Sequence, residues 1–171
     1  SAYKNGARVF LCEKEVALPS DAQIFIAENT RKALRLAGDN FYSHPYDEIK
    51  VIGITGTKGK TTTAHLVKDI LCSAGIPTGI IGTVGAEFNG VKLPTENTTP
   101  ESIELQKIMR AMLDMGCKAV ALEVSSLGLK HGRVDGIQFA AGVFTNLSPD
   151  HIGPLEHDSF SEYAYWQSVL F

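Results

Sequence analysis

Short apolar segments alternate with helical patterns along this chain. Two of them, residues 7–12 (ARVFLC) and 23–28 (QIFIAE), precede residues 31–48, which look helical at their start and end in a His-Pro turn. Four more are apolar and rich in β-branched residues: KVIGIT (50–55), IPTGIIG (76–82), KAVALEV (118–124) and FAAGVFTN (139–146). Strands of this kind, separated by helices, are typical of a parallel sheet covered on both faces.

Two helices are predicted between these strands. The first covers residues 60–74 and ends at Gly75. The second is expected to use Thr99 as its N-cap and Pro100 as its first residue, and to end before Gly116. The apolar side is predicted to consist of Leu66, Val67, Ile70 and Leu71 in the first helix, and of Leu105, Ile108, Met109 and Met112 in the second.

A third helix is predicted at the end of the chain. Ser159 and Glu162 have the spacing of a capping box, and the helical pattern after them runs into Phe171. Because the chain stops inside this pattern and its start also looks cut, we expect a fragment of a larger protein.

These patterns predict an α/β fold with a mostly parallel, doubly wound sheet. After Pro45 the strand-like segments become short, apolar and rich in β-branched residues, and this change places a domain boundary near residues 45–49. Residues 1–46 are therefore expected to belong to a smaller α/β N-terminal domain, and residues 47–171 to form the first part of a central domain.

Composition narrows the class of protein. Of the 171 residues, 44% are hydrophobic and 20% are charged, which is ordinary for a globular chain, and the net charge of -3 offers no basic field for nucleic acid. No segment approaches the roughly 18 apolar residues that a membrane span needs, and no secretion signal is visible. We therefore expect a cytoplasmic monomer that binds neither nucleic acid nor membrane.

The three cysteines do not indicate a metal site or a disulfide framework. Cys12, Cys72 and Cys117 are odd in number, far apart and set among apolar neighbours. We expect them to be core thiols.

A glycine-rich turn follows the strand at 50–55. Residues 53–64 read GITGTKGKTTTA, and the common phosphate-loop spacing fails because Ile54 stands where the first glycine should be. The turn nevertheless lies between a strand and a helix, where backbone N–H groups and a helix N-terminus converge on phosphate. A loop of the P-loop type is predicted, with Lys60 on the β- and γ-phosphates and Thr61 on a magnesium ion; the alternative is a plain glycine turn.

Several ordered segments resemble the Mur ligase family, whose members are ATP-dependent amide-forming enzymes of peptidoglycan precursor synthesis. TGTKGKTTT has the loop spacing normal in that family, and FYSHPYDEIKVIGITG, ENTTPESIELQ, ALEVSSLGLKHGRVDG and FTNLSPDHIG resemble the members that add the third residue to UDP-N-acetylmuramoyl-L-alanyl-D-glutamate. Folylpolyglutamate and cyanophycin synthetases share the loop but not ENTTPES. The resemblance spans nearly the whole chain.

The resemblance implies a reaction and a domain plan. The acid substrate would attack the γ-phosphate of ATP to give an acyl phosphate, and an incoming amino acid would displace phosphate. Residues 1–46 would be the remainder of the UDP-substrate-binding domain, residues 47–171 the first part of the ATP-binding domain, and the C-terminal domain would be absent. We therefore expect this chain alone to bind nucleotide weakly and not to turn over.

The resemblance also implies the site residues. Lys60, Glu123 and His151 would be catalytic, and Thr61, Glu123 and His151 would be metal ligands. Glu123 ends the strand KAVALEV, at the edge where open α/β sheets bind ligands. The remaining residues would bind ATP (Thr55, Gly56, Thr57, Lys58, Gly59, Lys60, Thr61, Thr62 and Asn146) or the UDP-muramoyl dipeptide (Asn97, Thr98, Thr99, Ser125, His131 and Arg133). The purely structural alternative for residues 97–99 is that they cap a helix.

Three positions depart from the family pattern. Lys58 stands where asparagine is commoner, and Leu127 where histidine often stands. Gln167 aligns with the lysine whose carbamate helps to hold a second magnesium ion. A glutamine cannot be carbamylated, so we expect that ion to be held less well.

These departures keep a second hypothesis open, a nucleotide-binding module or pseudoenzyme without ligase turnover. Gln167 favours it, whereas the intact set of Lys60, Thr61, Glu123 and His151 favours the ligase. A regulatory GTPase is disfavoured because the chain has no NKxD motif. The sequence does not identify the added amino acid.

Overall fold

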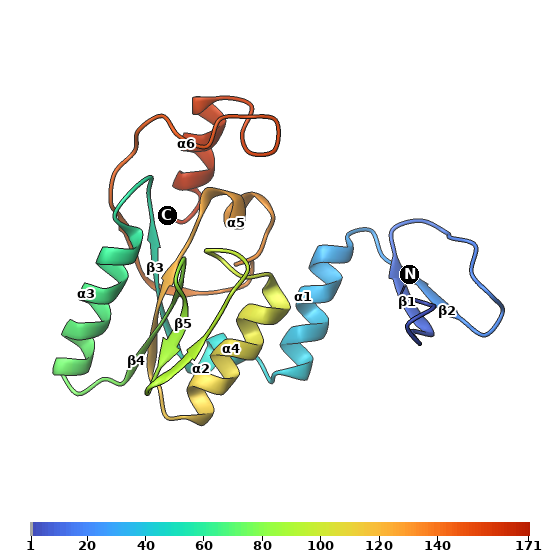
Figure 1. The fold of residues 1–171 in the computed structure, drawn as a ribbon, viewed down its shortest axis with the longest axis horizontal. Coiled ribbons are helices and arrows are strands. Elements are labelled where there is room, and N and C mark those ends of the chain that lie inside the picture. Colours follow the sequence, from blue (N-terminus) through green and yellow to red (C-terminus); the bar gives the residue numbers. More distant parts are fainter. Residues whose placement is uncertain (1) are drawn as a thin grey trace.

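The computed structural model describes residues 2–171. Near the N-terminus, strands β1 (Val9–Cys12) and β2 (Gln23–Ile26) pair in parallel as a separate two-stranded sheet. Helix α1 (Thr30–Phe41) connects this sheet to the rest of the molecule, and the two parts lie well apart (Figure 1). The two strands predicted at this end are confirmed, with shorter bounds.

The main sheet has six strands in the order β6-β5-β4-β7-β3-β8. Strands β4, β7, β3 and β8 are parallel, and β5 and β6 are added to one edge in antiparallel orientation. The mostly parallel α/β fold is therefore confirmed. The strand bounds are β3 Lys50–Thr55, β4 Thr78–Gly82, β5 Gly85–Phe88, β6 Val91–Leu93, β7 Ala119–Glu123 and β8 Phe139–Phe144.

Helices cover both faces of this sheet. Helix α3 (Lys60–Ser73) lies on one face and α4 (Ser102–Asp114) on the other (Figure 1). The short helices α2 (Pro45–Glu48) and α5 (Ser126–Lys130) and the last helix α6 (Phe160–Ser168) complete the fold. No helix in the described part of the chain could span a membrane.

The two predicted apolar helix faces have different outcomes. In α4, the predicted residues Leu105, Ile108, Met109 and Met112 are all buried in the larger core cluster. In α3, the prediction was wrong for Leu66 and Ile70, which are 57% and 66% exposed. The predicted Val67 does pack against the sheet, together with Ala64, which was not predicted.

Several predicted boundaries also differ from the structure. Helix α4 begins at Ser102 with Glu101 as its N-cap, because the Thr99 hydroxyl bonds backbone atoms of Glu123 and Ser125 instead. Helix α6 has the predicted Ser159 cap but ends at Ser168.

The cysteine prediction is only partly right. Cys117 is buried, but Cys12 is half-buried and Cys72 is exposed.

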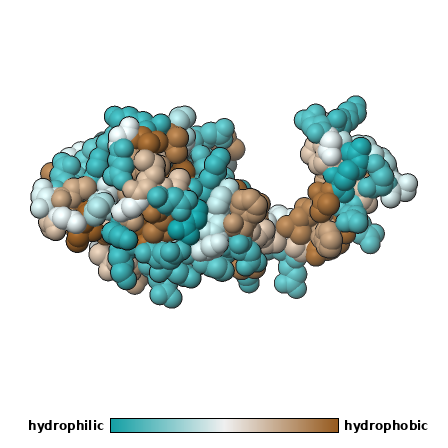
Figure 2. Space-filling view, turned by 90° about the horizontal axis from the view of Figure 1, so that it is seen from below, coloured by the Kyte–Doolittle hydropathy of each residue, from teal (hydrophilic) through white to brown (hydrophobic). Residues whose placement is uncertain are grey.

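A buried polar network attaches α1 to the main body. Asp39 pairs with Arg35, accepts a hydrogen bond from the Tyr46 hydroxyl, and accepts another from the Gln106 amide at 2.5 Å. Burial and the Asp39 carboxylate raise the pKa of Tyr46 to about 12. The molecule is narrow between its main body and the β1–β2 sheet, and apolar side chains are exposed along this link (Figure 2). The domain boundary near residues 45–49 stays a prediction.

Candidate active site

The glycine-rich loop, residues 56–59, connects β3 to α3. The Gly56 N–H is bonded to the Gln167 side chain, the Thr57 N–H to the Asn146 carbonyl at 2.9 Å, and the Lys58 N–H to the Asn146 side chain at 3.0 Å. Three successive amides of the loop therefore point into the protein. The first turn of an α-helix has N–H groups without intrahelical partners, and no side chain of residues 2–171 caps α3. The N-terminal amides of α3 are thus the donors available to an anion.

Close packing explains the first glycine of the loop. Gly56 has φ of +130°, and a Cβ there would lie 2.2 Å from Thr145 Oγ1. A larger residue would have to displace the segment after β8, on which Thr57 and Lys58 also depend.

Lys60, the first residue of α3, folds back onto the loop. Its Nζ donates to the carbonyl oxygens of Gly56 at 2.6 Å and Thr57 at 3.1 Å. Burial lowers the pKa of Lys60, and the carboxylates of Glu123 and Asp150 oppose that shift. The ammonium therefore lies over the mouth of the loop, close to acidic groups.

Thr61 and Glu123 meet at the carboxyl end of the sheet. Glu123 is the last residue of β7 and is fully buried. Its Oε2 accepts hydrogen bonds from the hydroxyls of Thr61 at 3.0 Å and Thr83 at 3.1 Å, and its Oε1 from the Thr83 N–H at 3.2 Å. Gly82 leaves the room for this carboxylate, because a Cβ there would lie 2.0 Å from Glu123 Oε1.

The predicted substrate residues Thr99 and Ser125 lie beside this carboxylate. The Thr99 hydroxyl donates to the Glu123 carbonyl oxygen at 2.9 Å, accepts from the Ser125 N–H at 2.9 Å, and lies 3.1 Å from Ser125 Oγ. Thr99 is fully buried, so its side chain serves the local fold. Ser125 also caps α5 through the Gly128 N–H.

Arg133 is engaged by an internal ion pair. Its guanidinium contacts Glu101 at 2.7 Å and the Thr99 carbonyl oxygen at 3.1 Å, and its Nε is buried without a partner. Glu101 also pairs with Arg31 of α1 at 3.1 Å. Burial and the nearby cations Arg31 and Arg133 lower the pKa of His131, which caps the end of α5.

A basic cavity adjoins these residues. It has a volume of about 250 Å³ and lies between α1 and α5. Its charged lining consists of Arg31, Lys32, Arg35, Lys130, His131 and Asp135.

Thr83 connects the two halves of the site. Its hydroxyl lies 3.1 Å from the Glu123 carboxylate and 3.1 Å from the Thr98 hydroxyl. Sequence reasoning missed Thr83, which has no motif around it and acquires its position from the turn between β4 and β5.

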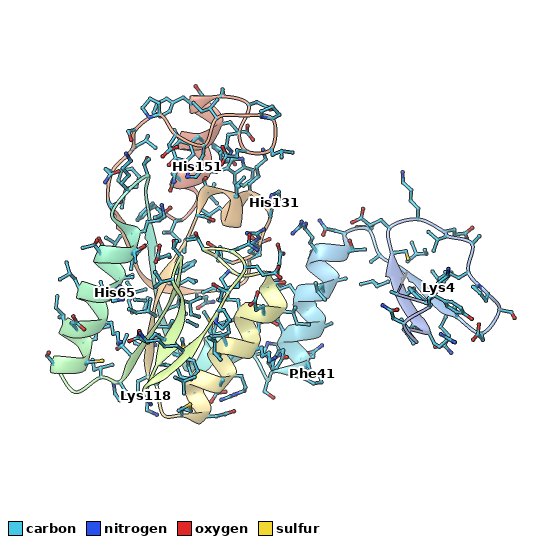
Figure 3. All side chains as sticks on the ribbon, viewed as in Figure 1. Lys4, Phe41, His65, Lys118, His131 and His151 are labelled. Atoms are coloured by element: carbon cyan, nitrogen blue, oxygen red, sulfur yellow. The ribbon has the colours of Figure 1, made fainter. Side chains whose placement is uncertain are left out.

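His151 is placed at the same end of the sheet. Figure 3 shows His131 and His151 toward the end where β3 and β7 finish, and Lys118, which precedes β7, at the opposite end. The His151 Nδ1 is 2.7 Å from Glu156 Oε1. Within residues 2–171, no group of three or more His, Cys, Asp or Glu side chains is arranged to hold a metal. The described geometry thus joins Thr61 to Glu123, and the metal role of His151 stays a prediction.

Fold and site together define the class of protein: an open α/β domain with a ligand site at the carboxyl edge of its sheet. A mostly parallel α/β domain carries a glycine-rich loop at the carboxyl end of its first central strand, and a buried carboxylate on the neighbouring strand faces that loop. This is the edge at which open α/β sheets bind ligands.

Comparison with known proteins identifies the family. Residues 54–171 match the sequence profile of the Mur ligase middle domain, and the chain therefore belongs to the Mur ligase family. It is 43% identical over 170 residues to the UDP-N-acetylmuramoyl-L-alanyl-D-glutamate–2,6-diaminopimelate ligase of Clostridium perfringens, covering 99% of this chain and 35% of that protein. It is 41% identical over 170 residues to the ligase of the same name from Bacillus licheniformis, covering 99% and 34%.

A solved structure agrees with these relatives. The structure of a UDP-N-acetylmuramoyl-L-alanyl-D-glutamate–2,6-diaminopimelate ligase superposes with a TM-score of 0.80 at 27% identity, covering 99% of this chain and 34% of that one. The chain spans about a third of the length of the relatives it matches.

Proposed function

We propose that the full-length protein is a cytoplasmic, ATP-dependent amide ligase of peptidoglycan precursor synthesis. It joins an amino acid to UDP-N-acetylmuramoyl-L-alanyl-D-glutamate through an acyl phosphate. The observation that carries this proposal is the contact between Thr61 and the buried Glu123, directly below the free N-terminal amides of α3. Family membership supports the ligase class.

The loop residues would act on the triphosphate of ATP. The N-terminal amides of α3 donate hydrogen bonds to phosphate oxygens, as helix N-termini do in other anion sites. Lys60 donates to the carbonyl oxygens of Gly56 and Thr57, and the remaining donor of its ammonium would reach the β- and γ-phosphates. Positive charge at this position stabilises the negative charge that develops as the phosphoryl group is transferred.

The buried carboxylate fits a divalent cation. Glu123 accepts hydrogen bonds from two hydroxyls and one N–H, and it forms no ion pair within residues 2–171. A buried carboxylate without a cationic partner is costly, and hydroxyl and carboxylate oxygens are the ligands that magnesium prefers. Thr61 and Glu123 would hold the ion, and a bound magnesium ion would neutralise charge on the β- and γ-phosphates.

The acid substrate would occupy the opposite side of Thr83. Asn97, Thr98, Ser125 and His131 are half-buried and retain surface for contact. Arg133 and the basic cavity between α1 and α5 offer cations to the carboxylate and the diphosphate of the UDP-sugar. We propose 2,6-diaminopimelate as the first amino acid to test, because the relatives named above are ligases of that amino acid.

The second candidate is a nucleotide-binding protein of the same family without ligase turnover. Gln167 is the observation that favours it, because it stands where the family resemblance leads us to expect a lysine, and its oxygen is engaged by the loop.

One experiment separates the two functions. The full-length protein is incubated with ATP, magnesium, UDP-N-acetylmuramoyl-L-alanyl-D-glutamate and 2,6-diaminopimelate, and both phosphate release and the mass of the product are measured. The ligase predicts phosphate release that requires all the substrates, and its loss in Glu123→Gln. Nucleotide binding without phosphate release for any amino acid would favour the second candidate.

A further inference from the structure

Gln167 is buried between α6 and the glycine-rich loop. Only 2% of the residue is exposed. Its amide oxygen accepts a hydrogen bond from the Gly56 N–H at 3.0 Å and contacts the Thr55 hydroxyl. Its amide nitrogen donates to the Tyr163 hydroxyl at 3.0 Å. Because a backbone N–H only donates, the Gly56 contact fixes which end of the amide is oxygen.

Tyr163 continues the contact to the next loop residue. Its hydroxyl donates to Thr57 Oγ1 at 2.9 Å, and Tyr163 is fully buried. Gln167 and Tyr163 are four residues apart, so they lie on the same face of α6. This face of α6, which we call the α6 clamp, therefore holds Thr55, Gly56 and Thr57.

The clamp determines the orientation of the loop peptides. With its N–H bonded to Gln167, Gly56 turns its carbonyl oxygen toward Lys60 Nζ, 2.6 Å away. The carbonyl side of the Thr55–Gly56 peptide accepts a hydrogen bond from the Thr145 N–H at 3.0 Å, and Gln167 holds its N–H side. Without Gln167 the peptide would be held on one side only, at a glycine that tolerates a wide range of backbone angles. The residue whose carbonyl oxygen contacts Lys60 is therefore held at its N–H by a side chain more than one hundred residues further along the chain.

We propose that Gln167 is a positioning residue of the glycine-rich loop. Its amide holds the Thr55–Gly56 peptide in the orientation that places Lys60 and the α3 amides for a nucleotide triphosphate, and in this chain position 167 acts through these hydrogen bonds and not as an ion ligand. The nucleotide part of this inference rests on the proposed function. A loop that is already oriented binds its ligand without an ordering cost.

The chemistry of the amide makes it hard to replace at this position. A lysine ammonium has donors only and would face the Gly56 N–H without accepting from it. A glutamate would keep the acceptor but lose the donor to Tyr163, and would be buried with a charge. Glutamine is the side chain that satisfies both neighbours without charge.

The test uses Gln167→Met in the full-length protein, with Gln106→Met as the matched control. Gln106 is also 2% exposed and hydrogen-bonded, but to Arg35 and Asp39 at the α1–α4 junction. Two quantities are measured: hydrogen exchange at the Gly56 amide in the absence of ligand, and the Kd of magnesium ATP by calorimetry. Thermal unfolding records the general loss of stability in both variants.

We expect Gln167→Met to speed Gly56 exchange and to weaken magnesium ATP binding by about tenfold each, the effect of losing one or two buried hydrogen bonds. Gln106→Met should lower the Tm without either change. Tyr163→Phe, which removes one hydroxyl, should give a smaller shift in the same direction and serves if Gln167→Met does not fold.

Two results would overturn the inference. In one, Gly56 exchange in Gln167→Met is unchanged; in the other, exchange and Kd change equally in Gln106→Met. The exchange measurement needs no ligand, so it remains decisive even if the wild-type protein binds no ATP, a result that would instead refute the proposed function.

Discussion

The nucleotide side and the substrate side of the site differ in how much bonding capacity they leave for a ligand. On the nucleotide side, the α3 amides are uncapped and Lys60 is held only by loop carbonyl oxygens. On the substrate side, Arg133 is already paired with Glu101, and Thr99 is enclosed by backbone contacts. The nucleotide side is thus preformed, whereas the substrate side must exchange an internal ion pair for its ligand.

Because of this difference, we expect substitutions on the two sides to have separable effects. Thr83 is the residue through which the sides touch, since its hydroxyl reaches both Glu123 and Thr98. The predictions below test the separation in the full-length protein, from the largest expected effect to the smallest.

The largest effect is expected on the nucleotide side. Lys60→Ala should weaken magnesium ATP binding by about 100-fold, because hydrogen bonds from a charged donor to phosphate are among the strongest in proteins. Lys68→Ala is the control, since Lys68 belongs to the same helix as Lys60 but pairs with Glu87 of β5. Calorimetry gives the two affinities, and circular dichroism checks the fold. Equal affinities for Lys60→Ala and wild type would show that the loop is only a turn.

A somewhat smaller effect is expected on the substrate side. Arg133→Ala should weaken binding of UDP-N-acetylmuramoyl-L-alanyl-D-glutamate by roughly 20-fold and leave ATP binding unchanged, because a charged partner of the ligand is lost. Arg110→Ala is the control, since Arg110 pairs with Glu48 and Asp114 away from the site. Glu101→Gln sharpens the test, because it should release Arg133 from its ion pair and should not weaken binding of the acid substrate. Loss of ATP affinity in Arg133→Ala would mean that the sides are not separable.

Thr83 should show an intermediate behaviour with a small amplitude. Thr83→Val removes the hydroxyl that joins Glu123 to Thr98 and should lower kcat by about tenfold, because a hydrogen bond to the Glu123 carboxylate and one to Thr98 are lost. Thr83→Ser keeps the hydroxyl and should retain most of the rate. A steady-state comparison of kcat and KM for both substrates checks this, and a Thr83→Val enzyme with wild-type kcat would remove Thr83 from the site.

The smallest effect concerns acid stability near the substrate side. His157 is fully buried and its Nε2 lies 2.8 Å from Ser126 Oγ, while its Nδ1 has no hydrogen-bond partner among residues 2–171. Burial lowers the pKa of His157, so the folded protein binds this proton less readily than the unfolded chain does. Its contribution therefore makes the free energy of unfolding fall as the pH drops below about 6.5.

Urea unfolding at about pH 7.5 and about pH 5.5 measures this contribution, because the pH interval spans the unfolded histidine pKa. The wild type should lose more stability between these values than His157→Gln does. His131, whose pKa is also lowered, is present in both proteins, so the difference isolates His157. An equal loss in the two proteins would contradict the assignment.

Local patterns account for the parts of the fold that the sequence predicted. The run KVIGIT is strand β3 with the predicted bounds, and the apolar stripe of α4 is buried. Ser159 caps α6 as its spacing to Glu162 indicated. In each case the signal and its structural cause lie within a few residues of each other.

One missed element had a readable signal. Strands β5 and β6 are joined through Asn89 and Gly90, which have φ of +45° and +81°. An Asn-Gly pair between two short strand-like runs is a strong hairpin signal, and it was available in the sequence.

The other differences arise from tertiary contacts. Leu66 and Ile70 fit a helix stripe with Val67, but they are exposed, and the sheet packs against Val67 and Ala64. The contact of Gln167 with the loop depends on how α6 packs, and no local sequence pattern predicts that packing. The glycine-rich turn predicted Lys60 and Thr61, and the family resemblance added Glu123, whereas Thr83 and Tyr163 emerged only from the structure.

The most direct test of the central claim follows an oxygen atom from substrate to product. Both carboxylates of the glutamate in UDP-N-acetylmuramoyl-L-alanyl-D-glutamate are labelled with oxygen-18. The full-length protein is supplied with ATP, magnesium and 2,6-diaminopimelate, and the released phosphate is analysed by mass spectrometry. Because an acyl phosphate leaves one carboxylate oxygen on the phosphate, we predict one labelled oxygen in each phosphate released. Phosphate without label would contradict the account, because ATP would then be hydrolysed without activation of the acid.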